Sequence, residues 1–492
     1  MPSGTPVKDD LNAATGDFRQ NSGLSVWIWT SVGLGALLRL VWLGYKSFWL
    51  DEIASVVIAR LQGTAFWSML WRAEGNMALY YVVLRPWLHF GWGEGRVRVL
   101  SALLGVASIP VIYALGRRLF DEASARMATL FFAVNACAVA VSQEARGYSL
   151  LVLGVLVSTY LFVRLIERPS FALACAYGLA TGLTFYCHYF GLFIPAAQAI
   201  SLLALPRGHI PWKQLALAAL LIALAAVPVL WMIHIQDIGH ITWVDKPSLL
   251  ELYHLGAYLA AGSGKLAGAV LLALDLALLG LFLKILKTVW REDAADSDLR
   301  RWRYTLVASC LFTPIVIVLL VSVVRPIFYH RFLIIALPAW VMMTAAGAEG
   351  IRSRPWRLAA IAGVCALSLV SAVTSHWRVK EDWRGVTTYL IAHASPEDRV
   401  LYYQPEGYFA VENYRNWLPG GNAPRPTGVG VNPNNRDWQK QLGGAPRAWL
   451  VLYRLKPKDS AADAIKVDLS ARYKIEWEFP FRAVTIIEFG SE

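Results

Sequence analysis

Charged residues are scarce in this chain, since Asp, Glu, Lys and Arg make up only 16% of its 492 residues. Soluble proteins carry about 25% charged residues, so a water-soluble enzyme of this length would lack the polar surface that it needs. Hydrophobic residues account for 57% of the chain, and the 21 tryptophans suit side chains at membrane-water interfaces. The composition excludes a soluble globular protein and indicates an integral membrane protein.

Cysteine is also rare, and its spacing carries no chemical signal. The five cysteines all fall in apolar runs, and no two of them have CxxC spacing. This pattern excludes a CxxC redox or zinc motif and favours buried small apolar side chains. The residues are Cys137, Cys175, Cys187, Cys310 and Cys365.

Long apolar runs dominate the first three quarters of the chain. A membrane-spanning helix needs about 20 largely apolar residues, and the polar, partly acidic segment Met1–Gly23 does not resemble a signal peptide, so we expect the first run to be retained. The sequence predicts an α-helical polytopic membrane protein with about eleven transmembrane helices. They lie near residues 24–44, 98–116, 124–142, 148–163, 171–188, 190–206, 214–233, 264–286, 304–324, 332–349 and 356–375.

The loops between these runs differ in positive charge, which predicts orientation. Every second loop is rich in Lys and Arg, from Arg117 and Arg118 to Arg352, Arg354 and Arg357. Because cytoplasmic loops carry the excess of Lys and Arg, we expect a cytoplasmic N-terminus in the plasma membrane. The net charge of +12 then reports orientation, and no nucleic-acid partner is expected.

Two regions outside the runs fall on the opposite, extracytoplasmic side. The first outer loop, residues 46–97, interleaves tryptophans with arginines and predicts interfacial helices. Residues 376–492 have ordinary polarity and predict a small α/β extracytoplasmic domain, with a helix at Trp383–Ala394 and strands at Arg399–Gln404, Ala448–Leu455 and Tyr473–Glu488, the last broken at Pro480. We read Pro419–Asn435 as a loop and residues 1–375 as the transmembrane domain.

Ionisable residues at the membrane edge are candidate functional residues, and on the outer side they occur in three places. The first is Phe48-Trp-Leu-Asp-Glu52, directly after the first run. Either Asp51 caps a helix that begins near Ile53 and Glu52 favours its positive end, or the pair provides a catalytic carboxylate.

The second place is the short loop Ser142-Gln-Glu-Ala-Arg-Gly-Tyr-Ser149. It is either an ordinary hairpin turn with an ion pair, or a site that combines Glu144, Arg146 and Tyr148. A turn needs only small polar residues, whereas this one has an acid, a base, an amide and a phenol.

The third place is the loop from Arg325 to Arg331, which also holds Tyr329 and His330. Its cations either snorkel to the interface or clamp a phosphate, since a guanidinium presents a planar fork of donors. Together the three loops offer an acid-base set and phosphate-binding cations on one membrane face, which a lipid-phosphate substrate would need.

The order of these motifs resembles a known family. Besides the three loops, Arg98-Val-Leu-Ser-Ala-Leu-Leu-Gly105, Ala114-Leu-Gly-Arg-Arg-Leu-Phe120 and Tyr329-His-Arg-Phe-Leu333 resemble the polyprenyl-phosphate-sugar-dependent glycosyltransferases of the GT-C fold. The nearest branch is similar to the bacterial protein mannosyltransferases and aminoarabinose transferases, in glycosyltransferase family 39. Relatives often have Pro-Pro-Leu-Tyr-Tyr in the first outer loop, where this chain has Asn76-Met-Ala-Leu-Tyr-Tyr81, so sugar or acceptor specificity is open.

The resemblance implies transfer of a sugar from a polyprenyl-phosphate donor to a hydroxyl of a glycan, lipid or protein, with inversion. It implies Asp51 as the general base, with Glu52 and Glu144 in supporting roles. Arg331 would hold the lipid phosphate. Substrate-binding residues would further include Arg146, Tyr148, Tyr329, His330, Tyr80 and Tyr81.

No metal or cofactor is required by this mechanism, although a divalent metal is compatible with it. His188, His234, His240 and His254, with Asp237 and Asp245, lack tight ligand spacing, so we expect interfacial or structural histidines. The alternative function is a transporter or flippase of lipid-linked sugars. Transporters place charges near the bilayer midplane and contain repeats, whereas this chain has only Asp275 as a clear mid-span charge and no evident repeat.

Overall fold

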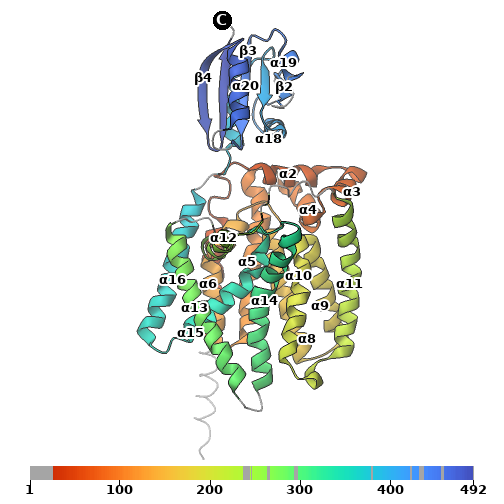
Figure 1. Cartoon of the computed structure of the whole chain (residues 1–492), viewed down its shortest axis with the longest axis vertical. Helices are drawn as coiled ribbons and strands as arrows, with labels where there is room; N and C mark the ends of the chain where they lie inside the picture. The colour runs from red at the N-terminus through yellow and green to blue at the C-terminus, as the bar shows by residue number, and fades with distance from the viewer. Residues whose placement is uncertain are drawn as a thin grey trace, which may run out of the picture. The chain divides into compact units, whose positions relative to one another are not determined.

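The computed structural model describes residues 26–236, 244, 246–262, 266–292, 297–377, 380–421, 424–431, 437–455 and 459–490 (Figure 1). The chain divides into two compact units. Unit 1 comprises Met1–Val41, Gln62–Val83 and Arg98–His376, and unit 2 comprises Trp42–Leu61, Leu84–Val97 and Trp377–Glu492. Each unit is described separately below.

Unit 1 is built of helices, and several of them bend or break. It begins with the helix Val26–Leu40. The following elements are α3 (Gly63–Arg72), η1 (Gly75–Met77), α4 (Ala78–Trp87, shared with unit 2), α5 (Glu94–Leu119, shared with unit 2), α6 (Glu122–Val134), α7 (Ala136–Ser142), α8 (Tyr148–Glu167), α9 (Phe171–Cys187), η3 (Tyr189–Leu192), α10 (Phe193–Ser201), η4 (Leu202–Ala204), η5 (Arg207–His209), α11 (Trp212–Ile235), α12 (Leu249–Ala261), α13 (Leu266–Arg291), α14 (Ser297–Val324), η7 (Phe332–Ala336), α15 (Leu337–Glu349) and α16 (Arg354–His376).

The prediction of a polytopic helical protein is confirmed. Within the described residues, seven helices are long and apolar enough to cross a membrane, or eight if the bent pair α6 and α7 counts as one span. Three further apolar helices are shorter: Val26–Leu40, Phe171–Cys187 and Tyr189–Ala204. Each of the eleven predicted ranges coincides with one of these segments, while the number of true spans stays a prediction.

The helices of unit 1 differ strongly in burial, which identifies its centre. In the span formed by η7 and α15, 89% of the most apolar window is buried, against 17% for α11. The side chains of Leu220, Leu224 and Val227 on α11 are more than half exposed. Because lipid is as apolar as a protein core, the pattern is typical of a central helix surrounded by lipid-facing ones.

The predicted span 124–142 is interrupted in the structure, where α6 and α7 meet at an angle of 52°. Asn135 lies at the break, and its side chain accepts the N–H of Ala138 at 2.9 Å, which caps α7. The guanidinium of Arg39 donates to the carbonyls of Ala133 and Phe132, at 2.8 and 3.1 Å, at the end of α6. Both helix ends at the break therefore have partners in the apolar interior.

Unit 2 contains a five-stranded sheet with strand order β2-β1-β3-β5-β4. β1 pairs parallel with β2 and β3, whereas β5 pairs antiparallel with β3 and β4. This confirms the predicted small α/β domain. Its elements are α2 (Leu50–Arg60), η2 (Leu88–Phe90), α17 (Trp383–His393), β1 (Arg399–Tyr402), α18 (Pro405–Arg415), β2 (Thr427–Gly430), α19 (Asp437–Leu442), β3 (Arg447–Tyr453), α20 (Ser460–Ser470), β4 (Lys474–Phe481) and β5 (Val484–Gly490).

Two details of this domain differ from the sequence prediction. The loop predicted at Pro419–Asn435 contains the short strand β2, and its residues 422–423 and 432–435 lie outside the described residues. The last strand run breaks after Phe481, at Ala483 with a φ of 58°, and not at Pro480. Pro480 remains within β4 because β4 is an edge strand, where a missing N–H can face away from the ladder.

Candidate functional site

The loop between α7 and α8 is held by Gln143, which joins two other helices of unit 1. Its amide nitrogen donates to the carbonyl of Leu38 at 2.9 Å, near the end of the first helix. Its amide oxygen lies 3.3 Å from Nδ1 of His376, the last residue of α16. The loop is therefore fixed by helix ends far away in the sequence, and not by its own turn alone.

Glu144 and Arg331 form an ion pair that joins the second and third loops of the sequence analysis. Both side chains are mostly buried, with 15% and 13% of their surface exposed. The guanidinium of Arg331 also lies 5.1 Å from the ring centre of Tyr148. The structure thus brings together Glu144, Tyr148 and Arg331, three residues that the sequence analysis proposed from separate loops.

Aromatic and histidine rings surround this ion pair. The rings of Tyr329 and His330 lie 4.5 Å apart, and the ring of Tyr258 on α12 lies 5.1 Å from that of His330. Tyr258 is half-buried and within electrostatic reach of Arg331 and Glu144. Sequence reasoning missed Tyr258 because it falls inside an ordinary apolar helix with no motif around it.

His330 is neutral in this surrounding. Burial, followed by the neighbouring Arg331 cation, lowers its pKa to about 4. Its buried Nδ1 has no hydrogen-bond partner among the described residues. A neutral ring can act as a hydrogen-bond donor or acceptor beside Arg331 without adding a second positive charge.

Tyr80, Tyr81 and Arg146 lie along the other side of the same loop. The hydroxyl of Ser101 on α5 lies 3.0 Å from that of Tyr80 and donates to the carbonyl of Arg146 at 3.4 Å. Tyr81 is buried, and its ring packs edge-on against that of Tyr80 at 6.3 Å. Tyr80 is therefore connected to the Glu144 loop through Ser101, and Tyr81 packs against Tyr80.

The close packing of this loop also depends on Gly147. A Cβ atom there would lie 3.2 Å from the carbonyl oxygen of Cys187 and 3.3 Å from Cβ of Tyr80. These distances are tighter than ordinary carbon contacts. The glycine of the Ser-Gln-Glu-Ala-Arg-Gly-Tyr motif thus permits the approach of the first outer loop to the start of α8.

Asp51 and Glu52 belong to unit 2, where they open α2. The carboxylate of Glu52 accepts the N–H of Trp49 at 3.3 Å, and Glu52 is buried. The predicted capping by Asp51 of a helix beginning near Ile53 is therefore wrong, because α2 begins at Leu50 and Glu52 provides the capping hydrogen bond. Asp51 is at the second helical position and is partly exposed, and its catalytic role stays a prediction.

The segment that carries Asp51 is held by residues near the start of the sheet domain. The hydroxyl of Tyr414 accepts the N–H of Phe48 at 2.6 Å, and Glu381 accepts the N–H of Leu50 at 2.8 Å. Lys380 lies over the ring of Trp49, with Nζ 3.7 Å from its centre. Tyr414 and Glu381 carry no sequence motif, so sequence reasoning did not find them.

The described residues contain no group of three or more His, Cys, Asp or Glu side chains that could hold a metal ion. His188 and His254 occupy separate surroundings, since His254 pairs with Glu251 at 3.2 Å while Nδ1 of His188 accepts the N–H of Phe190. Asp237, His240 and Asp245 lie outside the described residues. Metal dependence stays a matter for experiment.

Residues 88–232 match the model of a family described as dolichyl-phosphate-mannose-protein mannosyltransferase. Among curated proteins, a lipid A galacturonosyltransferase, RgtD, from Rhizobium johnstonii is 35% identical over 85 residues. That match covers 15% of this chain and only 18% of the length of the relative. Both sequence matches are therefore partial.

Solved structures match over nearly the whole chain. ArnT from Cupriavidus metallidurans bound to undecaprenyl phosphate has 13% identity and a TM-score of 0.59, covering 94% of this chain and 98% of that chain. The archaeal oligosaccharyltransferase AglB from Archaeoglobus fulgidus, in complex with an inhibitory peptide and a dolichol-phosphate, has 11% identity and a TM-score of 0.53, covering 88% and 69%. The chain therefore has the GT-C fold, and its resemblance to the GT-C glycosyltransferases, drawn from the loop motifs, is confirmed.

Proposed function

We propose that this chain is a membrane glycosyltransferase that moves a sugar from a polyprenyl-phosphate donor to an acceptor hydroxyl. The observation that carries the proposal is the buried cluster of Arg331, Glu144 and Tyr148. A guanidinium fixed by a carboxylate and an aromatic ring is pre-organised to receive phosphate oxygens. The undecaprenyl phosphate bound to ArnT and the dolichol-phosphate bound to AglB support a donor of this class.

The reaction is a single displacement with inversion at the anomeric carbon. The acceptor oxygen attacks that carbon and forms the new glycosidic bond, while the bond from the carbon to the phosphate oxygen breaks and its electron pair leaves with the lipid phosphate. Asp51 takes the proton from the attacking hydroxyl, which is assistance worth about 10²–10⁴-fold. Arg331 neutralises the charge on the departing phosphate, and Glu144 orients Arg331.

The partially matched lipid A galacturonosyltransferase supports a lipid acceptor, with glycan and protein hydroxyls as alternatives to be tested. The first outer loop departs from the family at Asn76, whose side-chain oxygen accepts the N–H of Tyr189 at 3.0 Å. Asn76 thus occupies a structural position next to the candidate site. We assign acceptor or sugar selectivity to this part of the loop.

The test uses the purified full-length protein in vesicles with a radiolabelled polyprenyl-phosphate sugar and lipid, glycan or peptide acceptors. Asp51→Asn keeps the shape of the side chain but removes the base, so we expect kcat to fall by about 10²-fold or more with little change in KM. The control Glu406→Gln removes one exposed negative charge elsewhere in unit 2 and should leave both constants unchanged. Near-normal transfer by Asp51→Asn would contradict the assignment of Asp51 as the general base. Movement of the label across the membrane without transfer to an acceptor would contradict the glycosyltransferase proposal and favour a flippase.

The Lys and Arg bias of the loops supports an extracytoplasmic position for the sheet domain and a cytoplasmic N-terminus in the bacterial inner membrane. A reporter that is active only outside the cytoplasm, fused after Glu492, should be active. A fusion of the same reporter within the loop that holds Arg207, before Trp212, should be inactive. An inactive reporter after Glu492 together with an active one in the loop before Trp212 would contradict the proposed topology.

A further inference from the structure

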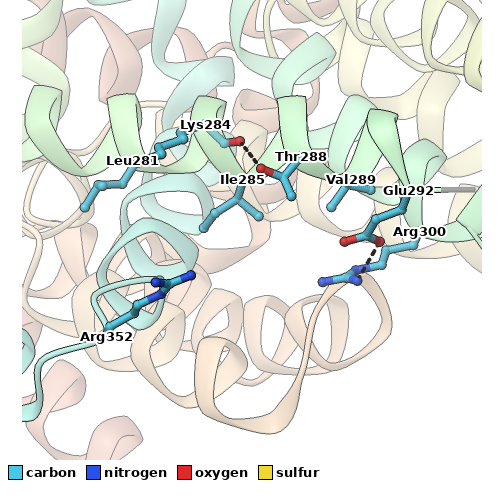
Figure 2. A pocket seen from close by; sticks show the side chains of 9 residues that line it. Leu281, Lys284, Ile285, Thr288, Val289, Glu292, Arg300 and Arg352 are labelled. Carbon is cyan, nitrogen blue, oxygen red and sulfur yellow. Dashed lines mark hydrogen bonds and ion pairs between the residues drawn. The ribbon is translucent and has the colours of Figure 1, made fainter.

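A cavity of about 420 Å³ opens where the end of α13, the start of α14 and the turn between α15 and α16 meet. Along α13 its wall follows one helical face, with residues spaced three and four apart. Figure 2 shows Arg300 and Arg352 turned toward the space below α13 from opposite sides. The lining residues are Leu281, Lys284, Ile285, Thr288, Val289, Glu292, Arg300, Gly350 and Arg352.

The charge of this lining is strongly positive. Lys284, Arg300 and Arg352 face a single acid, Glu292, which pairs with Arg300 at 3.0 Å. No ion-pair partner of Lys284 or Arg352 is found in the part of the chain that the structure describes. The cavity therefore retains two uncompensated cations among its described residues.

These cations are not needed to complete the end of the helix. Arg301 donates to the carbonyl of Val289, in the last turn of α13, at 3.3 Å, and to that of Glu292, directly after the helix. Arg301 does not line the cavity. Capping of the helix C-terminus thus does not account for Lys284 and Arg352.

Two exposed tryptophans on the helix ends beside the cavity indicate that it lies near the depth of lipid headgroups. Trp290, in the last turn of α13, is 47% exposed, and Trp356, in the first turn of α16, is 73% exposed. Exposed tryptophans at the ends of apolar helices are typical of the membrane-water interface. The apolar wall formed by Leu281 and Ile285 continues from the charged end of the cavity toward the spanning part of α13.

We propose that this cavity binds the phosphate headgroup of an anionic membrane lipid, with the phosphate between Lys284 and Arg352 and the start of an acyl chain against Leu281 and Ile285. Basic pockets between membrane helices are suited to such headgroups. A free phosphate ion would use the cations but not the apolar wall. The proposal does not depend on the transferase reaction, since none of these residues belongs to the candidate site.

The test measures binding of phosphatidylglycerol to the full-length protein in phosphatidylcholine nanodiscs, by native mass spectrometry and titration. The double substitution Lys284→Gln with Arg352→Gln should weaken binding by about 25-fold, because each cation near the surface contributes about a fivefold factor. The matched control Lys287→Gln with Arg354→Gln removes the same charge from α13 and from the start of α16, two residues after Arg352, since both residues are exposed and neither lines the cavity. The control should weaken binding less than about twofold, because its cations do not touch the headgroup.

Equal weakening by both double variants would overturn the proposal, since it would indicate general attraction to a positive surface. Displacement of phosphatidylglycerol by inorganic phosphate at constant ionic strength would overturn the assignment to a lipid. If the double variant fails to fold, Lys284→Gln alone provides the test. Lys284 is exposed, and this single change should weaken binding by about fivefold.

Discussion

The carboxylate of Glu381 accepts the backbone N–H of Leu50 at 2.8 Å, and Leu50 is the first residue of the helix that carries Asp51. The same oxygen accepts the indole N–H of Trp383 at 2.7 Å, and the other oxygen accepts the hydroxyl of Tyr453 at 2.8 Å. Glu381 is buried. Its three donors fix its orientation, and through Leu50 it fixes the first turn of α2.

We predict that Glu381→Ala lowers kcat of sugar transfer by about 10- to 100-fold, because a misplaced catalytic group is costly even when its own side chain is intact. Glu381→Gln should stay within about threefold of the wild type. Its amide oxygen can keep both N–H bonds, and its amide nitrogen can donate to the Tyr453 hydroxyl, which can also accept. The measurement is kcat and KM for both variants, with the melting temperature as a check of folding.

A kcat that is restored in Glu381→Gln would distinguish the hydrogen bonds of Glu381, which position α2, from its negative charge. An equal loss in Glu381→Ala and Glu381→Gln would mean that the negative charge of Glu381 matters and not its hydrogen bonds. Normal kcat in Glu381→Ala would mean that α2 holds its position without this contact.

We predict that Arg331→Lys raises KM for the donor by about tenfold or more. An ammonium cannot replace the planar fork that meets both Glu144 and a phosphate, nor the packing on the ring of Tyr148. Arg325→Lys, in the same loop but exposed, is the matched control. Donor binding measured with the lipid phosphate alone should weaken in the first variant only, and equal values for both variants would remove Arg331 from the phosphate site.

The pairing of Glu144 with Arg331 was predictable, because both are charged residues in short loops expected on one face of the membrane. The contacts of Glu381 and Tyr414 were not, since they join residues 331 and 366 positions apart and neither side chain stands in a recognisable pattern. The strand β2 was missed for a related reason. Its sequence Thr-Gly-Val-Gly has low strand propensity, and it forms because β1 provides a parallel partner.

The break between α6 and α7 also escaped prediction, since the apolar run there continues through Asn135. That residue caps α7 and donates to the carbonyls of Leu259 and Ala260 at 3.0 and 3.3 Å. We predict that Asn135→Ala lowers stability by about 1–3 kcal/mol through loss of the cap and of these buried hydrogen bonds. Asn135→Ser should recover part of this loss, because serine can cap α7 but is too short to replace the amide.

Thermal unfolding in detergent measures this effect, with Asn76→Ala as a second amide deletion at a half-buried position. Equal melting temperatures for the wild type and Asn135→Ala would show that the break does not depend on its cap. A loss in Asn135→Ser as large as in Asn135→Ala would assign the effect to the bonds with α12 instead.

His330 makes stability depend on pH in a defined direction. Its pKa in the folded protein is about 4, below the ordinary value of about 6.5, so between these values the unfolded chain binds a proton that the folded chain does not. The contribution of neutral His330 to the free energy of unfolding is therefore complete above the ordinary pKa of about 6.5. It is lost as the pH falls from there toward the pKa of the folded protein, about 4. The charged groups that face His330 are Arg331, Glu251 and His254, and Arg331 adds to the effect of burial.

We predict that acidification from about pH 7.5 to about pH 5 lowers the melting temperature of the wild type more than that of His330→Asn. Asparagine keeps a polar side chain of similar size but does not titrate. The contribution of this position to the pH dependence of the melting temperature is therefore lost in the variant. His209→Asn, at an exposed position in η5, should follow the wild type. A His330→Asn curve parallel to that of the wild type would mean that the proton is taken up elsewhere, and that the ring of His330 stays accessible to water in the folded protein.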